Sequence, residues 1–372
     1  MAQQRPDDST DMETAEFPSP TNTTPKPRSD VEHCIDTYTH LESIIIHPET
    51  KELLVLTSSL TGDYSGGKIF LLKSIYSPVT TQQIIDSPIN LKSFIRYNTQ
   101  RTVGGNTAGC WISSNEFVAS TERGTVEIWQ KIFASDKYSV ESGAWSDLAF
   151  EAVSVMYGHN NIVSSVRCWP TDAENLVTSS HDGSCRIWSM KSYMSTDCYR
   201  AHLGPVHALE CQTDGNNLFV TGATDRSVLV RLWDRREKLS VGRVLGLQDY
   251  FSVRSLSWGV HNPSTLAIGT ETGHLVLHDF RSMNSDVHLL SIQPHDDVIR
   301  ELSFCPQHQS LLATASHDNT ARVLSVADGE MLAGPVKHSD MVTTVEWYPQ
   351  SKLLLSAAVN CEIMYTLAQC EK

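Results

Sequence analysis

Two tripeptides in the sequence contain the groups of a catalytic triad. Ser180-His181-Asp182 is repeated at Ser316-His317-Asp318, and a serine, a histidine and an aspartate can together carry out nucleophilic catalysis. Adjacent side chains on a β-strand point to opposite faces of the sheet, however, so they cannot form a proton relay. The two tripeptides therefore favour a structural role over a catalytic one.

A phosphate-binding loop is the second pattern that could support chemistry. The stretch TGDYSGGKIF, residues 61–70, has Gly62, Gly67 and Lys68 at the spacing of that loop. The loop also needs Ser or Thr after the lysine, and then a helix whose amino terminus faces the phosphates. Here Ile69 follows, and KIFLLK predicts a strand. We expect a hairpin tip longer than its counterparts, which is either a binding loop or a tolerated insertion.

The elements around these patterns repeat along the chain. Four segments share a histidine followed by an aliphatic residue four positions later and another three further on: GHNNIVSSVRCWP, AHLGPVHALECQT, PHDDVIRELSFCP and KHSDMVTTVEWYP. A fifth, QDYFSVRSLSWGV, has aspartate in place of the histidine. The anchor positions are 159, 202, 249, 295 and 338, so the period is 43–47 residues. Such a period predicts stacked structural repeats.

A strand, a tight turn and a second strand follow each anchor, as in LVTSSHDGSCRIWSM and LLATASHDNTARVLSV. We count seven copies over 31–372, and they predict an all-β, seven-bladed propeller. The last copy is short of an outer strand, which residues 31–39 could supply to close the ring. Blade 2 is the least regular copy, because 75–110 and 132–150 do not align cleanly.

The repeats resemble WD repeats, which open with a histidine and close with Trp-Asp. This resemblance implies that the turn aspartate, the anchor histidine, a strand hydroxyl and the tryptophan form a buried, structural hydrogen-bonded set. Blade 3 then has the complete set, blade 4 has Ala223 at the hydroxyl position, and blade 6 has Leu324 at the tryptophan position. The expected members are His159, Ser180, Asp182 and Trp188; His202, Asp225 and Trp233; and His295, Ser316 and Asp318.

Composition limits the partners that this chain is expected to have. The 372 residues carry a net charge of −14, so we expect basic proteins rather than nucleic acid as direct partners. Residues 1–30 are rich in Pro, Ser and Thr and predict an acidic, disordered tail. No signal peptide or membrane-spanning run is apparent. We expect a protein of the cytoplasm and nucleus without metal, cofactor or catalytic residues.

Several segments show a closer resemblance. LLVLTSSLTGDYSGGKIFLLK, FVASTERGTVEIWQ, YGHNNIVSSV, CYRAHLGPVHAL, SLSWGVHNPSTLAIGTETGHLVLHDFRS and KHSDMVTTVEWYP are similar to the family of methylosome WD-repeat proteins. That resemblance implies a non-catalytic cofactor that binds and activates the type II protein arginine methyltransferase. It also implies that the chain helps to recruit Arg-rich substrates such as histones and Sm proteins.

In that family the blade 1 hairpin carries an aromatic side chain that inserts into the methyltransferase. The matching segment here consists of Asp63, Tyr64, Ser65 and Gly66. The family's tryptophan aligns with Ser65, so the anchor is missing at its own position. Tyr64 could take its place, or the interface could be rebuilt.

Two alternatives remain at this stage. A propeller of this kind could be a substrate adaptor of a ubiquitin ligase or a subunit of a chromatin complex, because WDRR at 233–236 and LHDFRS at 277–282 resemble the W-D-x-R signature of ligase-binding propellers. It could also be an enzyme, since some propellers hydrolyse or isomerise substrates. That would require carboxylates or histidines that converge on the channel, and the sequence alone does not reveal such a set.

Overall fold

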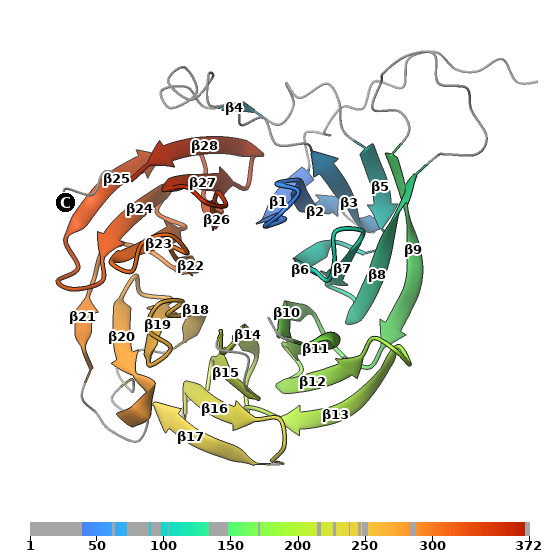
Figure 1. Cartoon of the computed structure of the whole chain (residues 1–372), viewed down its shortest axis with the longest axis horizontal. Helices are drawn as coiled ribbons and strands as arrows, with labels where there is room; N and C mark the ends of the chain where they lie inside the picture. The colour runs from blue at the N-terminus through green and yellow to red at the C-terminus, as the bar shows by residue number, and fades with distance from the viewer. Residues whose placement is uncertain are drawn as a thin grey trace, which may run out of the picture. The chain divides into compact units, whose positions relative to one another are not determined.

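A computed structural model describes residues 39–61, 64–72, 89–90, 98–102, 104–133, 148–169, 172–213, 217–225, 228–237, 239–244, 247, 252–282 and 288–368. All of them lie in the unit Ile35–Lys372. In these ranges the strands form seven four-stranded antiparallel sheets, and Figure 1 shows them arranged as blades around a central channel. The predicted all-β, seven-bladed propeller is confirmed. The predicted tail, 1–30, lies outside the described residues.

The blades are numbered along the chain, and each is given from its innermost to its outermost strand. Blade 1 contains β1 (Thr39–Ile46), β2 (Leu53–Thr61), β3 (Tyr64–Leu72) and β5 (Asn98–Thr102). Blade 2 contains β6 (Asn106–Trp111), β7 (Glu116–Thr121), β8 (Thr125–Phe133) and β9 (Leu148–Tyr157). Blade 3 contains β10 (Val163–Trp169), β11 (Asp172–Ser180), β12 (Ser184–Ser189) and β13 (Met194–Arg200). Blade 4 contains β14 (Val206–Cys211), β15 (Leu218–Ala223), β16 (Val230–Asp234) and β17 (Ser240–Val244).

The remaining blades follow the same order. Blade 5 contains β18 (Val253–Trp258), β19 (Thr265–Thr270), β20 (Leu275–Asp279) and β21 (Leu290–Ile292), with the short 3-10 helix η3 (Phe280–Ser282) after β20. Blade 6 contains β22 (Ile299–Phe304), β23 (Leu311–Ser316), β24 (Thr320–Ser325) and β25 (Met331–Lys337). Blade 7 contains β26 (Val342–Trp347), β27 (Leu353–Ala358), β28 (Glu362–Leu367) and β4 (Ile89–Asn90).

The hydrophobic core lies between the blades. In β2, the run Leu53-Leu54-Val55-Leu56 is entirely buried, although successive side chains on a strand point to opposite faces. Leu53 and Val55 pack with residues of blade 7, whereas Leu54 and Leu56 pack with residues of blade 2. Seven such clusters among the described residues each join two adjacent blades. Both faces of a blade are therefore covered, which explains the continuous apolar runs of the inner strands.

The closure of the ring differs from the sequence-based expectation. Residues 31–39 were expected to form the outer strand of blade 7, but Thr39 begins β1, the innermost strand of blade 1, and 31–38 lie outside the described residues. The outer strand is β4, whose Ile89 pairs with Ile363 of β28. Because β4 belongs to the connection between β3 and β5, blade 1 supplies the strand that completes its neighbour.

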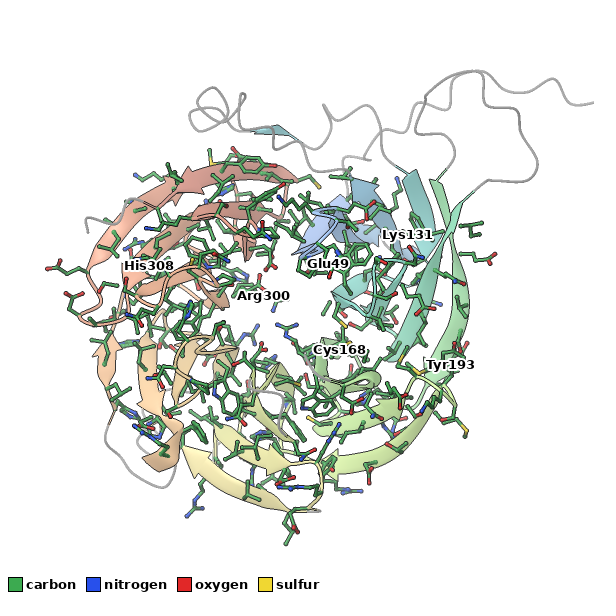
Figure 2. The ribbon with its side chains drawn as sticks, in the orientation of Figure 1. Glu49, Lys131, Cys168, Tyr193, Arg300 and His308 are labelled. Carbon is green, nitrogen blue, oxygen red and sulfur yellow. The ribbon has the colours of Figure 1, made fainter. Side chains whose placement is uncertain are left out.

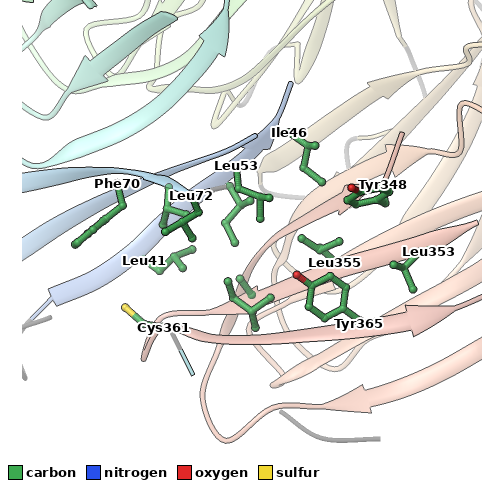
Figure 3. Packing of buried hydrophobic residues seen from close by; sticks show 14 residues of the cluster. Leu41, Ile46, Leu53, Phe70, Leu72, Tyr348, Leu353, Leu355, Cys361 and Tyr365 are labelled. Carbon is green, nitrogen blue, oxygen red and sulfur yellow. The ribbon is translucent and has the colours of Figure 1, made fainter. Parts of the chain in front are cut away.

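Blades 1 and 7 also share backbone and apolar contacts. The backbone N–H of Leu41 donates to the carbonyl of Val359 at 3.0 Å, and Figure 3 shows side chains of both blades packed together, with Leu41 beside Cys361. These contacts join the first described strand to the last sheet. Within the part of the chain that the structure describes, no helix is long and apolar enough to cross a membrane.

Candidate functional site

Blade 3 contains a buried chain of hydrogen bonds. The indole Nε1–H of Trp188 donates to Thr178 Oγ1 at 2.8 Å, and His159 Nε2 lies 2.8 Å from the same hydroxyl. His159 Nδ1 lies 3.0 Å from Asp182 Oδ2. Because an ionised carboxylate can only accept, Nδ1–H donates to Asp182, and in that neutral tautomer Nε2 accepts the proton of the Thr178 hydroxyl. The set ties the turn, the anchor segment and the β12 strand to one another.

The hydroxyl in this set is not the one that the sequence suggested. Ser180 Oγ donates to the carbonyl of Asn161 at 3.1 Å and accepts the backbone N–H of Asp182 at 3.1 Å. Ser180 therefore holds the turn, while Thr178 links His159 to the indole. The two hydroxyls lie two positions apart on β11 and share a face of the sheet, so residue type alone could not separate them.

Blade 4 has the complete set, contrary to the expectation that Ala223 leaves it without a hydroxyl. Trp233 Nε1–H donates to Thr221 Oγ1 at 2.9 Å, and His202 Nε2 lies 2.9 Å from that oxygen. His202 Nδ1 lies 3.3 Å from Asp225 Oδ2. The sequence-based alignment again assigned the hydroxyl to a position two residues too late, 223 instead of 221.

Blade 6 has the same arrangement without an indole. His295 contacts Thr314 Oγ1 at 2.7 Å and Asp318 Oδ2 at 2.8 Å. Ser316 Oγ accepts the backbone N–H of Asp318 at 3.1 Å, as its counterpart does in blade 3. Leu324 is buried and takes the position of the tryptophan, as the sequence predicted.

The pKa shifts of the aspartate and histidine side chains agree with a structural role for these hydrogen-bonded sets. Burial alone would raise the pKa of Asp182, but hydrogen bonds from His159 and Ser184 and from backbone N–H groups hold it below its ordinary value. Burial, followed by the nearby charge of Arg231, lowers the pKa of His202 to about 4. His181, the middle residue of the first tripeptide, contacts His207 instead, with ring centroids 4.8 Å apart. The tripeptides therefore do not assemble a triad.

The blade 1 hairpin is the element that sequence analysis selected for docking. The ladder between β2 and β3 runs from Leu53↔Leu72 to Thr61↔Tyr64, which is nine pairs, whereas the ladder between β11 and β12 has five. The stretch is therefore a hairpin, as predicted, but it projects as a regular two-stranded ribbon that is four pairs longer. The strand that follows Gly67 excludes the helix that a phosphate loop requires.

The predicted docking residues lie at the tip of this ribbon. Tyr64 and Ser65 are the first two residues of β3 and pair with Thr61 and Leu60. The carbonyl of Gly66 accepts a hydrogen bond from Ser59 Oγ at 2.7 Å. Asp63 lies outside the described residues.

The paired glycines of the hairpin are strand residues rather than turn residues. A Cβ at Gly66 would meet atoms no closer than 3.7 Å, whereas a Cβ at Gly67 would lie 2.5 Å from the carbonyl oxygen of Thr57 and 2.6 Å from Asn106 Nδ2. The Asn106 amide fills that space, because its Nδ2 donates to the carbonyls of Thr57 and Lys68 at 3.0 and 3.2 Å. Gly67 therefore lets blade 2 hold the base of the ribbon.

An exposed apolar stripe lies on the outer strand of blade 2. On β9, the outer strand of blade 2, the alternating residues Val153, Val155 and Tyr157 are 41%, 37% and 76% exposed. Strand β9 contacts β5, the outer strand of blade 1. Contiguous apolar side chains on a surface are typical of protein-binding sites, and sequence analysis did not identify this one because blade 2 aligned poorly.

The central channel contains charged residues that sequence analysis also missed. Arg167 Nε donates to Glu210 Oε2 at 3.0 Å, and Glu301 Oε2 accepts the backbone N–H of Val345 at 3.0 Å. Burial, and then the negative charge of Glu301, raises the pKa of Glu346 to about 8. Among the described residues, no group of three or more His, Cys, Asp and Glu side chains could hold a metal ion.

The ring of blades and the histidine-centred hydrogen-bond sets define a WD40-repeat β-propeller. Residues 150–189 match the family model described as WD domain, G-beta repeat, and residues 265–350 match the one described as Anaphase-promoting complex subunit 4 WD40 domain. Propellers of this class are typically non-catalytic scaffolds for protein interactions.

Among individual proteins, the chain is similar to Methylosome protein WDR77 of Xenopus laevis, with 24% identity over 80% of each chain. It is also similar to Histone acetyltransferase type B subunit 2 of Aspergillus fumigatus, with 27% identity over 35% of this chain and 31% of that protein. A third relative is a guanine nucleotide-binding protein subunit beta of Arabidopsis thaliana, with 25% identity over 52% of each. The first of these similarities extends over most of the propeller, and the others extend over about half of it or less.

Proposed function

We propose that this propeller is a non-catalytic scaffold that binds and activates a type II protein arginine methyltransferase and helps to recruit Arg-rich proteins such as histones and Sm proteins. The observation that carries the proposal is the long β2–β3 ribbon of blade 1, with its nine residue pairs. Similarity to a methylosome protein over 80% of each chain supports it. The proposal places the chain in the cytoplasm and the nucleus, where such substrates occur.

The ribbon suits docking because its base is fixed and its tip projects. Asn106 holds the base through hydrogen bonds to the carbonyls of Thr57 and Lys68, so the base need not be ordered when a partner binds. The tip brings Tyr64 to the end of the strand. Aromatic residues at the centre of an interface often dominate its affinity, so Tyr64 is the proposed anchor.

Position 64 cannot simply reproduce an anchor at position 65. Neighbouring positions on a strand belong to opposite faces of the sheet, so a tyrosine at 64 would enter the partner from the other side of the ribbon. A methyltransferase that accepts Tyr64 therefore needs a pocket displaced from the one that receives a tryptophan at 65. The apolar stripe of Val153, Val155 and Tyr157 on blade 2 offers a second contact surface.

Recruitment of Arg-rich substrates agrees with the charge of the chain. Its 43 acidic and 29 basic residues give the net charge of −14, which raises the local concentration of cationic segments and the rate at which they associate. We therefore propose that the ribbon binds the methyltransferase and that the acidic surface attracts the Arg-rich substrate.

Substitution of the proposed anchor tests this function. Tyr64→Ala in the tagged full chain should reduce the amount of co-purified arginine methyltransferase at least about tenfold, which is the usual effect of losing an interfacial hot spot. Tyr193→Ala is the control, because Tyr193 is an exposed tyrosine (38%) of blade 3, away from the blade 1 ribbon. Equal recovery of the enzyme with all three proteins, at unchanged thermal stability, would contradict the proposed anchor.

A ligase adaptor remains the second candidate function, because two arginines of W-D-x-R type are exposed. Arg236 and Arg281 have side chains that are 70% exposed, and each folds back onto the aspartate two residues earlier, Asp234 and Asp279. Their identical placement in blades 4 and 5 would suit recognition by a ligase scaffold. An Arg236→Glu, Arg281→Glu variant that loses a co-purified ligase scaffold but keeps any methyltransferase would support this alternative.

A further inference from the structure

The seven innermost strands share an irregularity that shapes the central channel. Each shifts register near its start, and a β-bulge of this kind re-aims the side chain at the shift. The residues at the shifts line a cavity of about 60 Å³. They are Glu42, Thr107, Ser164, His207, Arg254, Arg300 and Thr343.

Three adjacent blades place positive or potentially positive groups at these positions. Blades 4, 5 and 6 contribute His207, Arg254 and Arg300, and Figure 2 shows Arg300 directed into the central channel. Arg254 Nη1 lies 3.2 Å from His207 Nε2. Two further histidines, His181 and His317, directly follow β11 and β23. We call these five residues the cationic mouth.

The two outer histidines lie where the innermost strands begin. The backbone N–H of His181 donates to the carbonyl of Ile162 at 2.9 Å, and that of His317 donates to the carbonyl of Val298 at 3.0 Å. Ile162 and Val298 immediately precede β10 and β22. The rings of His181 and His207 are in contact, with centroids 4.8 Å apart. The five residues therefore gather at one end of the channel.

The guanidinium groups of the cationic mouth are not neutralised. Among the described residues, neither Arg254 nor Arg300 has a carboxylate within 4.0 Å, and the buried Nε of Arg254 has no hydrogen-bond partner. The third arginine of the channel, Arg167, is paired with Glu210 at 3.0 Å. Two guanidinium groups without a carboxylate partner leave positive charge at this end of the channel for an anionic ligand.

The surrounding acidic groups do not remove the positive charge. Glu271 and Asp297 act at longer range on Arg254 and His317, and they make no ion pair with the cationic mouth in the described part of the chain. Glu301 also acts at longer range on Arg300, but it and Glu42 have other hydrogen-bond partners. Glu42 accepts a hydrogen bond from Ser58 Oγ at 2.7 Å, and Glu301 accepts the backbone N–H of Val345 at 3.0 Å.

Burial, and then repulsion between like charges, lowers the pKa values of two histidines of the cationic mouth. Burial, and then the charges of Arg254, His181 and Arg300, lowers the pKa of His207 to about 3. Burial and the same two arginines also lower the pKa of His181. These imidazoles are therefore neutral at physiological pH, and each can still donate one N–H to an anion.

Apolar residues precede four of the innermost strands, at the end of the channel where the cationic mouth lies. The residues just before β10, β14, β22 and β26 are Ile162, Pro205, Val298 and Met341. Met341 is 41% exposed. A free inorganic anion would gain nothing from such a rim, whereas a peptide could lay the side chains that flank its anionic residue on it.

We propose that the cationic mouth binds a phosphorylated side chain of a peptide, with Arg254 and Arg300 as the phosphate ligands and the apolar rim as the contact for flanking residues. Planar guanidinium groups match the oxygens of a phosphate in bidentate geometry. The cavity of about 60 Å³ has room for one such group rather than for a folded element. This inference does not depend on the proposed methyltransferase partner, because it concerns the channel rather than the blade 1 ribbon.

A peptide-retention assay with the purified full chain tests the proposal. The probe is an immobilised degenerate peptide library with a fixed central phosphoserine, compared with the same library carrying serine. We expect retention of the wild-type chain on the phosphoserine library to exceed that on the serine library about tenfold or more, because hydrogen bonds to charged groups are strong. Arg254→Gln, Arg300→Gln should lose the difference, and Arg236→Gln, which removes an exposed arginine from blade 4, should keep it.

A second variant, Met341→Glu, tests the proposal even if the Arg254→Gln, Arg300→Gln protein does not fold. It places a negative charge on the exposed rim without altering the core, so retention on the phosphoserine library should fall, whereas Met341→Gln should retain the protein. Inositol hexakisphosphate and inorganic phosphate are added as competitors. Equal retention of wild type on both libraries, or retention unaffected by the substitutions, would overturn the proposal. Binding of a labelled inositol phosphate without any phosphoserine preference would also overturn it, by assigning the site to a small molecule.

Discussion

Trp188 Nε1 lies 2.8 Å from Thr178 Oγ1, and this link joins strands β11 and β12 through the interior of blade 3. The hydroxyl also meets His159 Nε2 at 2.8 Å, so a single side chain satisfies two buried groups. The position of Thr178 in the hydrogen-bonded set explains why blade 3 matches the WD-repeat pattern although Ser180 does not contact the indole.

Removal of the Thr178 hydroxyl should destabilise the propeller more than removal of its counterpart in blade 6. Thr178→Val leaves the Trp188 indole N–H and His159 Nε2 without a partner, and each buried unsatisfied group costs about 1–3 kcal/mol. We expect a loss of about 2–4 kcal/mol in the free energy of unfolding, measured in urea. Thr314→Val should cost less, because Leu324 takes the place of the indole there. Equal losses for the two variants would show that the indole bond contributes nothing.

Asp182 should stabilise the fold at neutral pH and not in acid. Although burial raises its pKa, hydrogen bonds from His159 and Ser184 bring the pKa below the ordinary value of 3.8. The folded state therefore binds the proton more weakly than the unfolded state, so the contribution is present above pH 3.8 and is lost as the pH falls below it. In urea titrations, Asp182→Asn should be clearly less stable than wild type at pH 7, and the difference should shrink at pH 3. A difference independent of pH would count against this account.

Glu346 should have the opposite pH dependence. Burial, followed by the charge of Glu301, raises its pKa from 4.5 to about 8, so the folded state holds the proton more tightly than the unfolded state. Stability should therefore decrease as the pH rises from 4.5 to 8. Glu346→Gln should flatten this decrease and melt above wild type at pH 8.5 but not at pH 4.5, as followed by circular dichroism. Glu330→Gln, at an exposed position, serves as the control and should leave the pH profile unchanged.

The two glycines of the blade 1 ribbon should differ in their tolerance of a methyl group. Gly67→Ala would bring Cβ to 2.5 Å from the Thr57 carbonyl and 2.6 Å from Asn106 Nδ2, and overpacking of this kind costs about 1–3 kcal/mol. Gly66→Ala meets nothing closer than 3.7 Å and should change the free energy of unfolding by less than about 0.5 kcal/mol. Thermal unfolding of both variants gives the comparison. Equal tolerance would mean that Asn106 does not hold the base of the ribbon.

Repeat spacing predicted the blades, because each anchor segment and hairpin has to bury the same faces. It could not predict β4, since a two-residue strand from a distant connection leaves no periodic signal in the sequence. Nor could it separate Thr178 from Ser180, which share one face of β11. The charges of the channel were missed for a related reason: Arg254 and Arg300 occupy bulges, where the alternation of inward and outward residues is interrupted.

The hairpin of blade 1 could be predicted from the sequence, whereas its binding partner could not. A long hairpin was predicted, and the nine-pair ladder shows that it is a regular ribbon. Its partner is a proposal that rests on the ribbon and on the similarity to a methylosome protein. Gly67 allows the Asn106 amide to approach the base of the ribbon, a contact that the sequence pattern does not reveal.

Complex formation with a type II protein arginine methyltransferase is the most direct test of the proposed function. The purified full chain and the enzyme are mixed at micromolar concentration, analysed by sedimentation velocity, and assayed for methylation of a histone peptide. We predict a complex that sediments faster than either protein and an increased methylation rate that Tyr64→Ala reduces. Independent sedimentation of the two proteins, with a methylation rate unaffected by the propeller, would contradict the account.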